Sequence, residues 1–262
     1  MTAAARPPMV DAHCHFDLYP VPATVLREAE QERIYSIAVT NTPSVFDAMD
    51  RLASGLKYVR PALGLHPELA LERAVEMALF PRLLERTRYV GEVGLDYKAA
   101  VKPSDRQKQR GLFETILQHC ARAGGRILTI HSRRAEADVL AALKEHRPGV
   151  FILHWYSGSL KTLRAALEAG AFFSVNSAMT MSDRGQRIIR EIPPERVLTE
   201  SDGPFVTARG HASSPLEVRS VLKDLARLWQ LDPEETREIV FMAFESAIRA
   251  GEGLAEKRGT RG

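Results

Sequence analysis

Short runs of apolar and β-branched residues alternate with longer amphipathic stretches along the whole chain. The short runs predict eight strands, at residues 9–16, 34–40, 58–65, 88–95, 126–132, 150–155, 171–177 and 196–200. Elsewhere apolar residues recur at i, i+3, i+4 and i+7, which predicts helices at 23–31, 44–53, 71–86, 104–123, 135–146, 160–169, 183–192, 215–229 and 233–250. Within the 71–86 stretch, Pro81 is expected to break the helix.

This alternation is typical of repeated βα units and a parallel sheet. Eight units favour one (β/α)₈ TIM barrel over residues 1–250, with its functional site at the carboxyl ends of the strands. An open doubly wound sheet is the main alternative, but the sequence has no Gly-rich phosphate loop after the first predicted strand. Residues 251–262, which combine glycines with Lys257, Arg258 and Arg261, are predicted to form a flexible basic tail.

Composition narrows the class of protein. An apolar fraction of 45% in 262 residues is ample for a core, and neither a signal-like segment nor a membrane-spanning run is evident. Cys14 and Cys120 show no paired spacing, so both are expected to be reduced and the protein to be cytoplasmic, with no membrane partner. A net charge of +3 allows a phosphate-bearing substrate but lacks the strong basic excess of a nucleic-acid scaffold.

The stretch V-D-A-H-C-H-F-D, residues 10–17, carries the first candidate chemistry. On a strand, His13 and His15 project from one face and could bind a single metal ion. This motif alone is weak, since one histidine could equally be a hydrogen-bonded core residue. The other candidate ligands in the sequence decide between a metal site and a structural role for these histidines.

Further candidate ligands follow other predicted strands, in the order His66, Glu92, His131, His154 and Asp202. Each could be structural by itself, but a barrel would bring all of them together with His13 and His15 on one face. His119 and His146 fall on predicted helices and are assigned to structure, while the role of His211 stays open.

Four histidines and two carboxylates, with His66 nearby, exceed the ligands that one tetrahedral ion needs. They suit two divalent ions about 3.5 to 4 Å apart, bridged by a carboxylate and a water. Glu92 is the expected bridge, the water would be the nucleophile, and Asp202 could both bind metal and accept the proton of that water. Hydrolysis is the predicted reaction, and Mg, Mn or Zn would suit these ligands.

In order, the motifs D-A-H-C-H-F-D, G-L-H-P, G-E-V-G-L-D-Y, I-H-S-R, L-H-W-Y-S-G and E-S-D-G-P cover nearly the whole chain. In this it resembles the TatD family of metal-dependent deoxyribonucleases, within the amidohydrolase-like barrel superfamily. The resemblance implies that His13, His15 and Asp202 hold one ion, that His131 and His154 hold the other, and that Glu92 bridges them. His66 would face the substrate or the bridging water.

The chain departs from the family pattern at a few positions. The family's G-x-H-P-H reads G-L-H-P-E here, so Glu68 stands where a second histidine is common and local substrate contacts are affected. E-S-D-G-P and H-W-Y-S-G keep their metal-ligand residues, and a C-terminal Asn of the family is absent from F-M-A-F-E-S-A with little expected effect on catalysis.

Substrate contacts are predicted after the fifth and sixth strands. Arg133 could pair with a phosphate oxygen, or with Glu136 as a surface ion pair. Trp155 and Tyr156 could stack on a base or pack against a neighbouring loop. A basic run could follow a nucleic-acid backbone or remain a solvated helix surface, and consists of Lys98, Lys102, Arg106, Lys108 and Arg110.

Three functions fit these residues. The first is a two-metal phosphodiesterase acting on DNA, as an exonuclease on single strands or 3′ ends. The second is a metal-dependent hydrolase of a small ester or amide, or of an aminoacyl-tRNA ester; Glu92, in place of the carbamylated lysine of many amidases, counts against the amide. The third is a partner-dependent role in a bacterial multi-gene anti-phage system, which the intact set of metal ligands disfavours.

Overall fold

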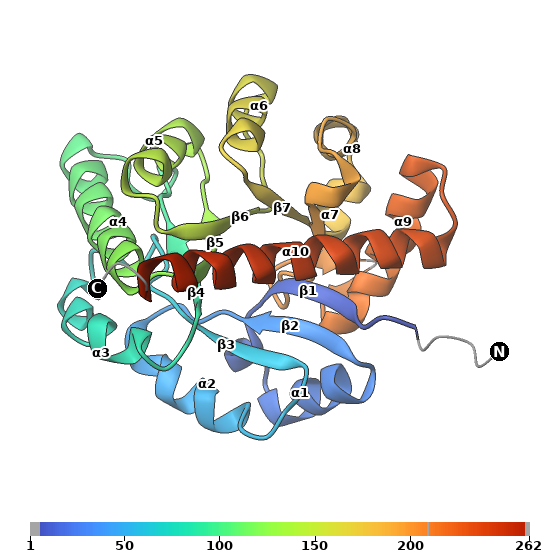
Figure 1. The fold of residues 1–262 in the computed structure, drawn as a ribbon, viewed down its shortest axis with the longest axis horizontal. Helices are drawn as coiled ribbons and strands as arrows, with labels where there is room; N and C mark the ends of the chain where they lie inside the picture. Colours follow the sequence, from blue (N-terminus) through green and yellow to red (C-terminus); the bar gives the residue numbers. More distant parts are fainter. Residues whose placement is uncertain (1–5, 209, 260–262) are drawn as a thin grey trace.

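The computed structural model describes residues 6–208 and 210–259. Eight parallel strands form one sheet in the order of the sequence, each paired with the next (Figure 1). The strands are β1 Met9–Cys14, β2 Ile34–Ala38, β3 Val59–Leu63, β4 Tyr89–Gly94, β5 Arg126–His131, β6 Gly149–His154, β7 Phe172–Val175 and β8 Val197–Thr199. All six residues of β1 and all six of β4 are buried, because the core lies inside the barrel and helices cover its outside. The predicted barrel is confirmed.

Helices follow the strands around the barrel (Figure 1). They are α1 Pro22–Gln31, α2 Phe46–Leu52, α3 Phe80–Leu84, α4 Pro103–Ala123, α5 Glu136–His146, α6 Leu160–Glu168, α7 Ser177–Thr180, α8 Asp183–Arg190, α9 Val218–Trp229 and α10 Pro233–Gly259. The helix predicted at 71–86 is interrupted, as expected, but before Pro81 rather than at it: a 3₁₀ turn at Ala74–Ala78 precedes α3. Pro81 lies in the first turn of α3, where its missing N–H costs no hydrogen bond.

The barrel closes between β8 and β1. The Asp202 N–H donates to the His13 carbonyl at 2.9 Å, and Thr199 Oγ1 donates to the Val10 carbonyl. The buried Asp11 carboxylate accepts from both the backbone N–H and the hydroxyl of Ser201, at 2.9 and 2.7 Å. These bonds fix the loop that carries Asp202 against the strand that carries His13.

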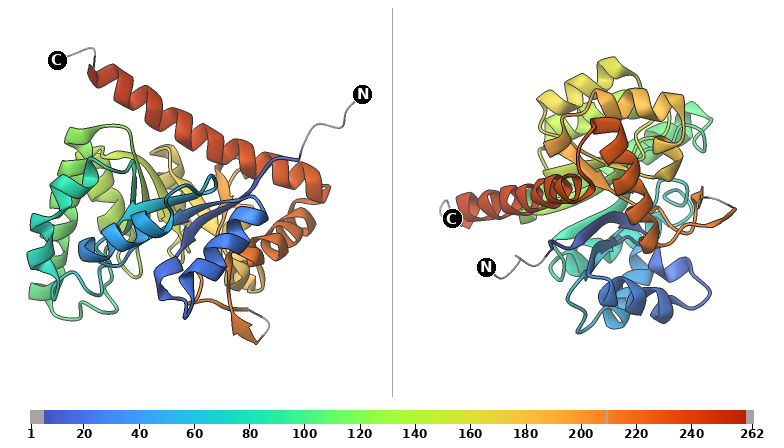
Figure 2. Two further views of the ribbon diagram at one scale, coloured as in Figure 1. Left: turned by 90° about the horizontal axis from the view of Figure 1, so that it is seen from below. Right: turned by 90° about the vertical axis from the view of Figure 1, so that its right-hand side faces the viewer.

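The long helix α10 crosses the end of the barrel where the strands begin, and the short β9–β10 hairpin (Thr207–Ala208 and His211–Ala212) projects on the other side (Figure 2). Residues 251–259, which were predicted to follow the helix as a tail, continue it, while 260–262 lie outside the described residues. Ala255 packs against Gly125, and Glu252 pairs with Arg88 at 2.9 Å. These contacts stabilise a helical end that its glycines disfavour. None of the described helices is long and apolar enough to cross a bilayer.

Candidate metal centre

The six residues predicted as metal ligands meet at the carboxyl ends of the strands. His13 lies on β1 with His15 just after it, Glu92 lies on β4, and His131 and His154 end β5 and β6. Asp202 follows β8. Their side chains are between 0 and 13% exposed. The strand pairing is irregular between Asp11 and Cys14 and between Val90 and Val93, which are the segments that carry His13 and Glu92. Such irregularities redirect a side chain relative to a regular strand.

Glu92 directs its two carboxylate oxygens at two different pairs of histidines. Its Oε1 lies 2.6 Å from His131 Nδ1 and 2.9 Å from His154 Nε2. Its Oε2 lies 3.2 Å from His15 Nε2 and 3.3 Å from His13 Nε2. A carboxylate that faces two nitrogen pairs in this way has the arrangement of a ligand shared between two cations.

Asp202 completes the group around His13 and His15. Its Oδ1 lies 3.8 and 3.6 Å from the two Nε2 atoms, which are themselves 3.3 Å apart. Two imidazole nitrogens and a carboxylate oxygen so close together in a buried site form a ligand set for a divalent ion.

Two of these histidines point their second ring nitrogen at an acceptor outside the cluster. His13 Nδ1 donates to Thr129 Oγ1 at 2.7 Å, and His131 Nε2 donates to Asp96 at 2.8 Å. A proton on that outer nitrogen leaves the inner nitrogen with the lone pair that a metal ion requires. The donors present therefore fit two divalent ions, whose ligands would be those that the family resemblance implies.

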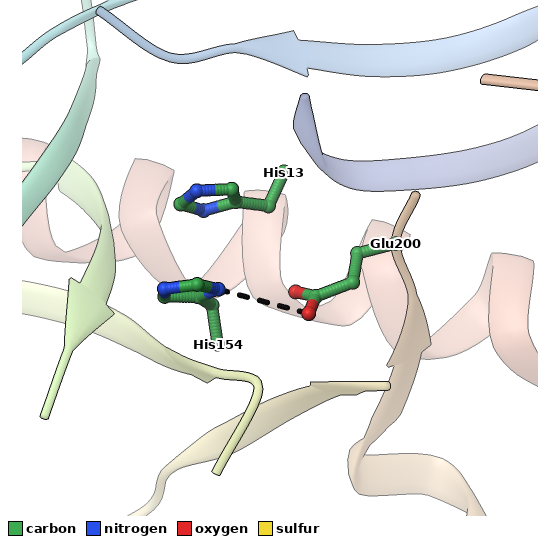
Figure 3. Close-up of side chains that lie close together, drawn as sticks. All are labelled: His13, His154 and Glu200. Carbon is green, nitrogen blue, oxygen red and sulfur yellow. Dashed lines mark ion pairs between the residues drawn. The ribbon is translucent and has the colours of Figure 1, made fainter. Parts of the chain in front are cut away.

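Glu200 lies beside the outer ring nitrogen of His154 as an ion-pair partner rather than as a hydrogen-bond acceptor (Figure 3). Its Oε1 lies 3.6 Å from His154 Nδ1, and the His154 ring stacks on that of His13 with centroids 3.9 Å apart. These three residues could also form a metal-ligand group. However, the Glu200 carboxylate accepts hydrogen bonds from Ser174 and Asn176, so we assign Glu200 to positioning His154.

His66 is held in the opposite tautomer, because its outer ring nitrogen accepts a hydrogen bond instead of donating one. The backbone N–H of Glu68 donates to His66 Nδ1 at 3.1 Å, so this nitrogen carries the lone pair and the ring proton of the neutral form lies on Nε2. His66 Nε2 lies 3.3 Å from Glu92 Oε1. This tautomer makes His66 a hydrogen-bond donor into the site, as expected for a residue that faces substrate or water, and a poor metal ligand.

The electrostatics of the cluster centre on Glu92. Burial acts to raise the pKa of Glu92, but the Coulombic effect of the surrounding histidines, His66, His154 and His13, outweighs it, so the pKa lies well below its usual range. Burial acts to lower the pKa of His154, yet Glu92 and Glu200 raise it well above its usual value. Burial raises the pKa of Asp202, which lets this carboxyl hold a proton. Burial and the neighbouring His154 lower the pKa of His13, so positive charge beside Glu92 is favoured on His154 and not on His13.

A cavity of about 560 Å³ opens over the cluster and is lined in part by Glu68, Arg133, Trp155 and Phe205. Trp155, 38% exposed, has a φ of 38°, an uncommon backbone conformation for a bulky residue. Arg133 pairs with Asp96 and Glu68 rather than with Glu136.

Tyr156 does not lie where stacking on a base would require. It is 1% exposed, its ring packs edge-on against Phe173, and its hydroxyl donates to the Ser159 carbonyl. The expectation that it contacts substrate is wrong, because the side chain belongs to the core.

Phe205, which sequence reasoning did not select, is 57% exposed in the cavity wall and packs edge-on against His15. Asp96 and Glu200 were also missed, although both stand inside the motifs G-E-V-G-L-D-Y and E-S-D-G-P. Their closeness in sequence to Glu92 and Asp202 was the signal that could have identified them. Within the basic run, Arg106 packs over the Tyr97 ring and Arg110 pairs with Asp138, and the run contributes nothing to the lining described for the cavity.

Comparison with known proteins places this geometry in a family. The family model described as TatD related DNase matches residues 10–249. The chain belongs to this family. Its members are metal-dependent hydrolases of the amidohydrolase fold, so the chain is a metal-dependent hydrolase with a buried His, Glu and Asp cluster.

Individual TatD relatives match over nearly their whole lengths. The uncharacterized metal-dependent hydrolase TatD of Mycobacterium tuberculosis is 32% identical, over 87% of this chain and 92% of its own. Human deoxyribonuclease TATDN3 is 24% identical, over 90% and 93%. The crystal structure of the TatD homologue YjjV from Escherichia coli superposes with a TM-score of 0.79 and 26% identity, over 90% and 95%.

Proposed function

We propose that this chain is a two-metal deoxyribonuclease that hydrolyses phosphodiester bonds from an end of DNA. The observation that carries the proposal is Glu92, whose two oxygens face two separate pairs of histidines. Two divalent ions bound there would acidify a water and polarise a phosphoryl oxygen. Human TATDN3, a relative over most of the chain, bears the name deoxyribonuclease, which supports DNA as the substrate.

The chain's own residues supply the remaining steps. Asp202, whose carboxylate faces His13 and His15, would accept the proton of the attacking water. His66 would donate its Nε2 proton in a hydrogen bond to a phosphoryl oxygen or to the water. Arg133 at the cavity mouth would pair with a phosphate oxygen, and Trp155 would stack on a base.

The size of the cavity supports attack at an end. About 560 Å³ is the size of a site for one small molecule, so a terminal nucleotide would enter where an intact duplex would not. A single strand or a frayed 3′ end would present such a nucleotide.

The test is degradation of end-labelled single-stranded and duplex DNA by chelator-stripped protein to which Mg, Mn or Zn is returned. The proposal predicts a metal-dependent ladder from one end that Glu92→Gln and Asp202→Asn abolish. Cleavage that survives both substitutions would refute it. Absence of cleavage by protein with bound metal would instead favour hydrolysis of a small ester.

A further inference from the structure

Arg133 is held between two carboxylates at the mouth of the cavity. Its Nε donates to the buried Asp96 at 2.7 Å, and its Nη2 pairs with Glu68. Asp96 is fully buried, whereas the Glu68 and Arg133 side chains are 46 and 38% exposed. The one guanidinium that lines the described cavity is therefore already neutralised on its solvent side.

The two carboxylates differ in how firmly they are fixed. Asp96 also accepts from His131 Nε2 and from the backbone N–H groups of Lys98 and Ala99, at 2.8 to 2.9 Å. The Glu68 carboxylate pairs with Arg133 at an exposed position, and exposed ion pairs contribute little free energy. Asp96 therefore positions Arg133, and the Glu68 carboxylate is the partner that an incoming anion can displace.

We propose that Glu68 is a specificity-determining residue that makes the site favour phosphodiesters over phosphomonoesters. A phosphate that reaches Arg133 must displace the Glu68 carboxylate, which stays nearby at the mouth. A diester carries one negative charge, whereas a monoester carries between 1.5 and 2 at pH 7, so the carboxylate repels the monoester more strongly. This inference rests on the proposed function, for which the diester is the substrate and a terminal monoester is a product.

The test is Glu68→Gln, with Glu72→Gln as the matched control. Glu72 is 70% exposed, comes from the same loop and pairs with Arg73 rather than with a residue of the cavity. The Glu68 backbone N–H that bonds His66 is kept in the variant. Calorimetry on metal-loaded protein would measure binding of inorganic phosphate and of a dinucleotide with a non-hydrolysable phosphorothioate linkage.

Glu68→Gln should bind inorganic phosphate about three- to five-fold more tightly at low salt, with a smaller gain for the dinucleotide, and added salt should reduce the difference. Glu72→Gln should match the wild type. The gain should vanish in an Arg133→Gln background if it acts through Arg133. Equal effects of the two single variants, or a gain that persists without Arg133, would overturn the inference.

Phosphate binding needs no turnover, so the two proposals fail separately. A protein that cleaves no DNA but shows the predicted change in phosphate selectivity refutes the nuclease. An active nuclease whose selectivity does not respond to Glu68→Gln refutes the role of Glu68.

Discussion

Replacing Glu92 with Gln should leave one bound metal ion where the wild-type protein binds two. The substitution keeps one amide oxygen and replaces the other ligand oxygen with an NH2 group, so the negative charge and the bridge between the two groups are lost. The group of His13, His15 and Asp202 has three ligands of its own, whereas the other group has only His131 and His154 besides residue 92. Removing one partner from a buried ion pair costs about 3–5 kcal/mol. This corresponds to a loss of roughly 100- to 4,000-fold in affinity at the two-histidine site.

The assay is elemental analysis after stripped protein is reloaded with Zn or Mn and freed of excess metal, with affinities measured by chelator competition. Asp224→Asn is the control, since Asp224 is a buried carboxylate that bonds Thr180 outside the cluster, and it should keep both ions. A Glu92→Gln protein that still binds two ions at wild-type affinity would refute the bridging role of Glu92.

Three further outcomes follow from neighbouring contacts. Asp96→Asn should weaken metal binding about 10- to 100-fold, because Asp96 orients His131, and unchanged affinity in chelator competition would contradict this role. The pKa values of His131 and His154 are raised in the folded, metal-free protein. Their protonation therefore stabilises the fold fully below the unfolded pKa of 6.5, and this stabilisation is lost as the pH rises through the folded pKa values. Metal loading at pH 7 should therefore release protons, and heats that do not depend on the buffer's ionisation enthalpy would contradict it. Tyr156→Ala should lower the free energy of unfolding, measured by denaturant titration, by about 3–5 kcal/mol. Trp155→Ala should change it by less than about 1 kcal/mol and should raise the KM for DNA. The reverse pattern would contradict the assignment of Tyr156 to the core and of Trp155 to substrate binding.

The strands and the candidate ligand positions could be predicted from sequence because each strand is a short apolar run, and six of the eight carry a chemically distinctive residue near their carboxyl ends. Parallel topology then brings those ends together without further information. The orienting residues could not be predicted in this way. Whether Asp96 bonds His131, or Glu200 lies beside His154, depends on neighbouring strands and turns rather than on spacing.

Backbone geometry at Trp155 and tertiary packing of α10 explain the other differences from the predictions. Trp155 and Tyr156 are adjacent and similar in chemistry, and the left-handed turn at Trp155 decides which ring faces the cavity. The glycines at 251 and 253 predict the end of a helix, but packing of Ala255 on Gly125 extends α10 beyond them. Tertiary contacts outweigh local propensity in such cases.

The most direct test of the two-metal centre is anomalous diffraction from crystals loaded with Mn or Zn. The account predicts two peaks about 3.5–4 Å apart on either side of the Glu92 carboxylate, one beside His13 and His15 and one beside His131 and His154. A single peak, or a peak bound by Glu200 in place of Glu92, would contradict it.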